Sequence, residues 1–214
     1  MVSETDELLS LTKDIAATAY QKLVEIQSID MGQVSYSHEV PREMKCFADE
    51  IIEEMIIKRL MSTGISVLSE ERGEFGGQSK SSVRFVVDPL DGTVNFVRSL
   101  GPCSISIALY DNDQPIFGVL AIFPSGDFAW GGKGNGSFLN DRPIHVSKIT
   151  DPLQAAFCTG FPSRYRFDNH NSLEKHIKMM SYFGKVRMLG AASNSLLLIA
   201  KGAAEVYSEN QIML

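Results

Sequence analysis

The chain has 214 residues, 44% of them hydrophobic, which is enough to bury the core of one large domain or of two closely packed halves. Its 20 lysines and arginines are outnumbered by 26 aspartates and glutamates, and the net charge of -6 argues against a nucleic-acid polymer or an anionic membrane as the main partner. An acidic protein can still bind phosphate where metal ions reverse the local charge.

The cysteines and the N-terminus favour a reducing compartment. Cys46, Cys103 and Cys158 are odd in number, widely spaced and form no C-x-x-C pair, which predicts neither a disulfide framework nor a zinc site. Residues 1–10 lack the basic and apolar stretches of a signal peptide, and no apolar run is long enough to cross a bilayer. We therefore expect a cytoplasmic protein without a membrane partner.

Two helices are expected before any sheet. Residues 3–6 carry a helix N-cap pattern, and apolar residues then recur at helical spacing over residues 8–26. A second helical pattern runs over residues 43–62, where Gly64 is placed to end the helix.

Strands and turns follow these helices. The apolar runs at residues 65–68 and 83–87 predict two strands, separated by a mobile loop at residues 73–82 that is rich in glycine and serine. Residues 104–109 and 116–122 flank a turn and predict an antiparallel hairpin. The remaining expected elements are strands at residues 127–130, 137–139, 155–159, 185–188 and 204–208 and helices at residues 170–182 and 191–201.

Two patterns look like functional motifs but predict ordinary structure. The glycine-rich residues 132–136 lack the G-K-[ST] of a phosphate loop and are followed by strand residues, so they predict a hairpin turn. His170 and His176 show no metal-ligand spacing, and we expect surface or capping positions for both.

Two aspartates, Asp88 and Asp91, follow the apolar run of residues 83–87 directly. Pro89 fixes the chain between them and Gly92 allows it to turn, so both carboxylates can converge. Together with the Leu90 carbonyl they form a set of hard oxygen ligands that suits Mg²⁺. The alternative is an ordinary turn, because Asp-Pro and Asp-Gly are both common turn dipeptides.

A second acidic pair, Glu70 and Glu71, follows the strand at residues 65–68. If the two strands lie side by side, Glu70 joins Asp88 and Asp91 at one edge, as a site for two metal ions would require. An exposed acidic turn is the competing explanation.

Thr93 places a hydroxyl beside this expected site. Asp49, on the second helix, can orient that hydroxyl as a general base would require, although a solvated helix position is the simpler expectation from the sequence alone. The backbone N–H groups of Gly92 and Thr93 are expected to begin a short helical turn that faces a phosphate oxygen.

Two segments together resemble the paired motifs of the inositol monophosphatase family. They are L-S-E-E at residues 68–71 and V-V-D-P-L-D-G-T-V-N-F at residues 86–96, and the similarity continues in order through nearly the whole chain. The resemblance implies Glu70, Asp88, the Leu90 carbonyl and Asp91 as metal ligands, with Asp88 bridging two ions.

The resemblance also implies roles around the metal ligands. Thr93, supported by Asp49 and Glu70, would activate the attacking water. The expected substrate contacts are Asp91, Gly92, Thr93, Gly190, Ala191 and Glu209.

The resemblance further implies a fold and an activity. The expected fold is a mixed α+β and α/β layered αβαβ(α) sandwich of the sugar phosphatase type, with its last part missing. Residues 1–150 would form an α+β half with the metal site, and residues 151–214 would begin an incomplete α/β half. The expected activity is a Mg²⁺-dependent phosphomonoesterase that hydrolyses a small sugar or polyol phosphate with metal-activated water.

The same family implies two or three Mg²⁺ ions, Mn²⁺ as an alternative, inhibition by Li⁺ and a homodimer. Related activities stay open: a 3'(2'),5'-bisphosphate nucleotidase or a fructose-1,6-bisphosphatase uses a similar site. A non-catalytic metal- or phosphate-binding fragment is the alternative from another functional class.

The chain departs from the family pattern at three points. Cys46 stands in place of a threonine before the second helix, which argues against the family's mobile loop and its third, weaker metal position in this chain. Ala191 stands where the family often has serine or threonine, so one hydroxyl contact is absent. The family continues into a Trp-Asp pair that completes the second metal site, whereas this sequence ends at Leu214, so we expect either a fragment or an incomplete second site.

Overall fold

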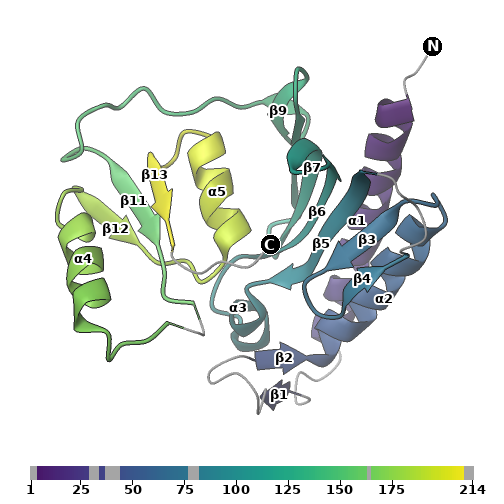
Figure 1. Ribbon diagram of the computed structural model, residues 1–214, viewed down its shortest axis with the longest axis horizontal. Helices are drawn as coiled ribbons and strands as arrows, with labels where there is room; N and C mark the ends of the chain where they lie inside the picture. The colour runs from purple at the N-terminus through teal and green to yellow at the C-terminus, as the bar shows by residue number, and fades with distance from the viewer. Residues whose placement is uncertain (1–3, 29–33, 37–43, 77–81, 163–164, 210–214) are drawn as a thin grey trace.

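The computed structural model describes residues 4–28, 34–36, 44–76, 82–162 and 165–209. Helices and sheets alternate in layers (Figure 1): α4 (His170–Met180), a small sheet, α5 (Ala192–Ala200), a large sheet, and then α1 (Glu4–Ser28) with α2 (Phe47–Met61). This arrangement confirms the predicted layered mixture of α+β and α/β structure.

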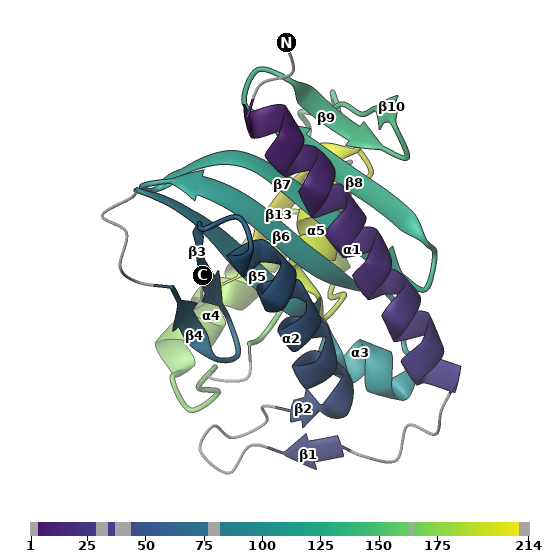
Figure 2. The same cartoon turned by 90° about the vertical axis from the view of Figure 1, so that its right-hand side faces the viewer.

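Helices α1 and α2 cover the outer face of the large sheet (Figure 2). Their apolar residues recur every three or four positions, so each helix can bury one face. The completely buried Ile15, Leu23, Ile52, Ile56 and Leu60 come from these faces. They pack in one core with Phe85, Ile105 and Ile107 of the sheet.

The second helix begins later than the sequence pattern predicted. Residues 44–46 are not helical but form β2 (Met44–Cys46), which pairs antiparallel with β1 (Val34–Tyr36), and the predicted start at Glu43 lies outside the described residues. The Asp49 carboxylate accepts a hydrogen bond from the Cys46 N–H at 2.8 Å. This side-chain cap satisfies an N–H that the helix leaves unpaired, so the helix begins at Phe47.

The large sheet contains eight strands among the described residues, in the order β10-β9-β8-β7-β6-β5-β3-β4. Only β3 and β5 pair in parallel; the other neighbours are antiparallel. The strands are β3 (Ser66–Ser69), β4 (Gly73–Phe75), β5 (Val83–Asp91), β6 (Cys103–Asp111), β7 (Gln114–Phe123), β8 (Asp127–Gly132), β9 (Gly136–Leu139) and β10 (Arg142–Pro143).

Two details of this sheet differ from the prediction and one confirms it. Strand β4 lies inside the predicted loop at residues 73–82, where it pairs with β3; residues 77–81 of that loop lie outside the described residues. Strand β5 does not end before the aspartates but continues through Asp91. The glycine-rich residues 132–136 form the predicted turn between β8 and β9.

The small sheet is parallel, with β11 (Ala156–Thr159) between β12 (Lys185–Arg187) and β13 (Val206–Ser208). Helix α4 follows β11, and α5 follows β12, so strands and helices alternate as predicted. Helix α5 contacts both β13 and β6, and it therefore lies between the two sheets.

The structure also describes the cysteines and the length and apolar character of the helices. Cys46, Cys103 and Cys158 are buried free thiols in the structure. Among the described helices, none combines the length and the apolar character that crossing a bilayer requires.

His176 is buried in the middle of α4, contrary to the surface or capping position predicted for it. The residue is 6% exposed, and the centroid of its ring lies 4.7 Å from that of the Phe161 ring. The Thr159 hydroxyl donates to the Ser208 carbonyl at 2.7 Å and lies 3.1 Å from His176 Nε2. Because the threonine proton is already used, Nε2 carries a proton that it donates to Thr159, and burial lowers the pKa of the ring, which favours its neutral form.

This burial predicts a pH-dependent stability. Burial lowers the pKa of His176 below its usual 6.5, so between that value and the lowered pKa the unfolded chain binds a proton that the folded chain does not. His176 should therefore contribute a fall in the free energy of unfolding as pH drops below 6.5, of at most about 1.4 kcal/mol per pH unit, while buried carboxylates with a raised pKa, such as Asp49, contribute in the opposite direction. Urea unfolding at pH 7.5 and 5.5 measures it.

Two variants assign that loss to its source. The change in stability caused by His176→Gln should be more favourable at pH 5.5 than at pH 7.5. His170→Gln, which changes an exposed histidine at the start of the same helix, should change the stability equally at both pH values. Equal pH profiles for wild type and His176→Gln would contradict the assignment.

Candidate metal centre

The acidic residues that follow β3 and β5 lie side by side. The two strands are parallel neighbours with Ser69 opposite Val87, and the Glu70 N–H donates to the Val87 carbonyl at 3.0 Å. This register places Glu70 beside Asp88, and their carboxyl groups lie within hydrogen-bonding reach of each other. The predicted neighbouring of these two strands is therefore confirmed.

The Asp-Pro-Leu-Asp segment is the distorted end of β5. Its pairing with β6 is regular up to Asp88 and resumes at Asp91 after a register shift. The Leu90 N–H donates to Asp88 Oδ1 at 3.0 Å, so the aspartate side chain stabilises the irregular backbone. The shift changes which way Asp88 and Asp91 point relative to a regular strand.

Gly92 ends this segment with a backbone that other residues rarely adopt. Its φ is 88°, and a Cβ there would lie 3.1 Å from the Ala191 Cβ and 3.3 Å from the Cys103 Cβ. Glycine thus permits both the turn into α3 (Thr93–Arg98) and the close approach of the segment before α5.

The three carboxyl groups have unfavourable surroundings for a negative charge. Burial, more than any other cause, raises the pKa of Glu70, Asp88 and Asp91, and for Asp88 the neighbouring Glu70 charge adds to it. Within the described residues, the lysine and arginine side chains that form ion pairs bind other carboxylates: Glu25, Asp14, Glu53, Asp113 and Asp168. A buried set of carboxylates that has no ion pair with a lysine or arginine of the described residues fits a hard divalent ion such as Mg²⁺.

Asp91 is turned toward α5. It accepts hydrogen bonds from the Ala192 N–H at 3.2 Å, the Ser193 N–H at 2.7 Å and the Ser193 hydroxyl. Free N–H groups at a helix N-terminus and the helix dipole both favour a carboxylate there. Among the residues that the structure describes, no three acidic, histidine or cysteine side chains are grouped closely enough to hold a metal ion.

Behind Asp91 lies a polar network that the sequence did not reveal. The Ser193 hydroxyl donates to Asp91 and lies 2.6 Å from the Ser104 hydroxyl, which in turn accepts from Asn194 Nδ2 at 2.9 Å. A carboxylate accepts and an amide nitrogen donates, so Ser104 must donate to Ser193. The network joins β6 to α5 and thus fixes Asp91 between the two sheets.

We expect Ser193→Ala to lower the free energy of unfolding by about 2 kcal/mol, because it removes a hydrogen bond to a charged group. Ser195→Ala is a matched control: its hydroxyl, also on α5, donates to the neutral Ala191 carbonyl at 2.9 Å, and its loss should cost about 1 kcal/mol. Urea denaturation of both variants measures the difference. A smaller loss for Ser193→Ala than for Ser195→Ala would contradict the expectation.

Thr93 and Asp49 come together as the sequence suggested. The Thr93 hydroxyl lies 3.2 Å from Asp49 Oδ1 and 3.2 Å from the Leu90 carbonyl oxygen. Asp49 is not solvated but only 2% exposed, and burial raises its pKa to about 6. The carboxylate is therefore still mostly ionised at pH 7 and able to accept the threonine proton in a hydrogen bond.

The remaining predicted substrate contacts lie around Asp91. Gly190 and Ala191 precede α5 directly, and the Gly92 backbone packs against Ala191. Glu209 accepts a hydrogen bond from the Tyr207 hydroxyl at 3.0 Å. Burial raises the pKa of Glu209, and so does the charge of Asp91. The predicted substrate contacts at residues 190, 191 and 209 thus lie near those at residues 91–93.

Sequence and structure comparisons give one consistent family. The family model described as "Inositol monophosphatase family" matches residues 4–213. The inositol-1-monophosphatase of Mesorhizobium japonicum is 30% identical over 201 residues, which cover 92% of this chain and 75% of that protein. The "fructose-1,6-bisphosphatase/inositol-1-monophosphatase" of Aquifex aeolicus is 32% identical over 155 residues, covering 72% of this chain and 57% of that protein.

A solved structure agrees with these relatives. The extragenic suppressor protein suhB of Bartonella henselae superposes with a TM-score of 0.88 at 25% identity, covering 97% of this chain and 80% of that one. The chain spans 56% to 65% of the length of three of the curated relatives that it matches.

Proposed function

Because this chain belongs to the inositol monophosphatase family, we propose that it carries the metal-binding core of a Mg²⁺-dependent phosphomonoesterase acting on a small sugar or polyol phosphate. The observation that carries this proposal is the parallel pairing of β3 with β5, which sets Glu70 beside Asp88 without a protein cation among the described residues. Buried like charges are stable together only when a cation or a proton neutralises them.

The proposed ligands of Mg²⁺ are the carboxylates of Glu70, Asp88 and Asp91 and the carbonyl oxygen of Leu90. When bound, the ion supplies charge stabilisation for the phosphate and lowers the pKa of a coordinated water. Mn²⁺ has similar ligand preferences, and we carry Li⁺ inhibition over from the family as a further proposal.

Thr93 is proposed to orient the attacking water. Its hydroxyl oxygen lies 3.2 Å from Asp49 Oδ1 and 3.2 Å from the Leu90 carbonyl oxygen, so the hydroxyl proton points toward these acceptors. The lone pairs of the hydroxyl oxygen are then free to accept a hydrogen bond from a water molecule. Asp49 is held in turn by the Cys46 N–H at 2.8 Å. Asp49 thus fixes the direction of the Thr93 hydroxyl proton beside the proposed metal ligands.

The substrate is proposed to lie between the β5 end and the segment before α5. Gly92, Thr93, Gly190 and Ala191 offer backbone N–H groups, and Asp91 and Glu209 offer carboxylates for its hydroxyl groups. In this arrangement the N-terminal half, residues 1–150, supplies the metal ligands, and residues 151–214 supply part of the substrate contacts. We also propose a cytoplasmic homodimer, which the buried free thiols are compatible with.

The test is phosphate release from a panel of inositol and sugar phosphates by the purified protein with millimolar Mg²⁺. Fructose 1,6-bisphosphate and 3'(2'),5'-nucleotide bisphosphates in the same panel distinguish the related activities. Release that stops with excess EDTA and returns with Mg²⁺ would support the proposal. Mg²⁺ binding without phosphate release from any substrate would instead support a non-catalytic metal-binding protein.

A further inference from the structure

Glu53 is a completely buried carboxylate that the proposed reaction does not use. It lies on α2, one helical turn after Asp49, and its exposed fraction is 0%. A buried carboxylate is costly unless its oxygens are paired and hydrogen-bonded. The surroundings of Glu53 therefore indicate what the side chain is for.

The two carboxylate oxygens of Glu53 bind the last residue of β3 and the segment that follows it. The Ser69 hydroxyl donates to Oε1, and the Arg72 Nε–H donates to Oε2. Arg72 also reaches the Glu50 carbonyl with Nη2 at 3.4 Å. Ser69 and Arg72 are the residues on either side of Glu70 and Glu71, so one side chain holds both ends of this acidic pair.

The other side of the same segment is held by β5, through the hydrogen bond from the Glu70 N–H to the Val87 carbonyl. Asp49 and Glu53 are four residues apart and therefore share one face of α2. Asp49 reaches Thr93, after β5, while Glu53 reaches Ser69, at the end of β3. Helix α2 thus links the ends of the two strands whose acidic residues form the proposed metal centre.

We propose that Glu53 is a positioning residue for the metal centre: by binding Ser69 and Arg72 it holds Glu70 against Asp88 and so sets the affinity of the carboxylates for Mg²⁺. The inference rests on the proposed function in that the acidic cluster is taken to bind this ion. Residues that orient metal ligands commonly change metal affinity by about 10- to 100-fold when they are replaced.

Glu53→Gln tests the inference with little change in volume. The amide oxygen can still accept from Ser69, but the NH₂ group then meets the Arg72 Nε–H, and two donors cannot bond. We expect calorimetric titration with MgCl₂ to give a dissociation constant about tenfold or more above that of wild type. At saturating Mg²⁺, kcat should stay within about twofold, because Glu53 touches neither ligand nor substrate.

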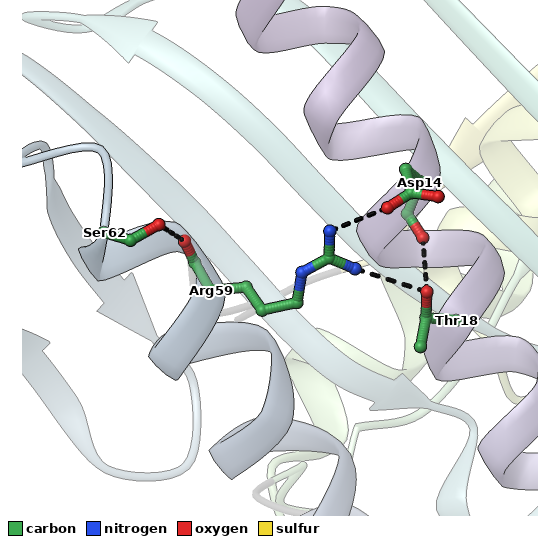
Figure 3. Close-up of polar contacts among 4 residues, drawn as sticks. All are labelled: Asp14, Thr18, Arg59 and Ser62. Atoms are coloured by element: carbon green, nitrogen blue, oxygen red, sulfur yellow. Dashed lines mark hydrogen bonds and ion pairs between the residues drawn. The ribbon is translucent and has the colours of Figure 1, made fainter.

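The same helix offers a matched control. Figure 3 shows Arg59 of α2 reaching across to Asp14 at 2.7 Å and to Thr18 at 3.2 Å, both on α1. Asp14→Asn removes this exposed ion pair of α2 without touching the segment after β3. If Glu53 merely helped to hold α2 in place, both variants would weaken Mg²⁺ binding; we expect only Glu53→Gln to do so, with Asp14→Asn within about twofold of wild type.

A second variant keeps the test decisive if Glu53→Gln does not fold. Ser69→Ala removes one of the two hydrogen bonds and should weaken Mg²⁺ binding severalfold. The double variant should lose less Mg²⁺ affinity than the product of the two single losses, because the two residues act as one unit. Mg²⁺ affinities within twofold of wild type in the folded variants would overturn the inference, as would a wild type that binds no Mg²⁺. Mg²⁺ binding in a wild type that releases no phosphate would overturn the proposed function alone.

Discussion

Asp88→Asn is expected to reduce phosphate release by about 100-fold or more and to abolish tight Mg²⁺ binding. The asparagine keeps the shape of the side chain and the acceptor for the Leu90 N–H, but it removes one of the negative charges that face Glu70. Losing a direct ligand should cost at least as much as losing a residue that only orients one, for which about 10- to 100-fold is typical.

The same substitution should stabilise the metal-free protein. In EDTA, burial and the neighbouring charge of Glu70 both raise the pKa of Asp88, which means that its ionised form opposes folding near neutral pH. Replacing it by a neutral amide relieves that repulsion. A gain in stability together with a loss of activity is typical of residues kept for function.

Thermal unfolding with EDTA and with Mg²⁺ measures both effects. Wild type should gain in Tm when Mg²⁺ replaces EDTA, since an ion that binds only the folded state stabilises it. Asp88→Asn should have the higher Tm in EDTA and gain little from Mg²⁺. Asp113→Asn, which changes an aspartate whose side chain is 95% exposed, should match wild type throughout. An Asp88→Asn protein that binds Mg²⁺ as tightly as wild type would exclude Asp88 as a ligand.

The second large effect is expected for Thr93→Ala. General acid-base groups typically contribute about 100- to 10,000-fold, and the alanine removes the hydroxyl that Asp49 orients. We expect kcat to fall by about 100-fold or more, with Mg²⁺ affinity by calorimetry within a few-fold of wild type. The separation follows because the hydroxyl lies beside the proposed ligands without being one of them.

Thr93→Ser provides the control for this result. Serine restores the hydroxyl next to Asp49 and the Leu90 carbonyl, so it should recover activity to within about tenfold of wild type. If Thr93→Ala retained full kcat, the role proposed for Thr93 would be wrong. If it lost Mg²⁺ binding in parallel with kcat, Thr93 would belong to the metal site instead.

Much of the fold was predictable because its signals are local. The helical spacing of residues 8–26 predicted α1, and the alternating runs around residues 111–115 predicted the hairpin of β6 and β7. The start of α2 was predicted too early, because its cap depends on Asp49 reaching back to the Cys46 N–H. Strand β4 was missed because its three residues carry no alternation of their own and are fixed only by pairing with β3.

The candidate site divides in the same way. The sequence by itself determined which candidate oxygen ligands exist and that Glu70, Asp88 and Asp91 follow two apolar runs, since those are properties of neighbouring residues. Only the tertiary structure decided what holds them. Asp91 binds Ser193, 102 positions away, and Glu53 and His176 are buried by segments that no local pattern connects to them. Burial and hydrogen-bond partners at such separations depend on how the layers pack, and helical or strand periodicity carries no record of that packing.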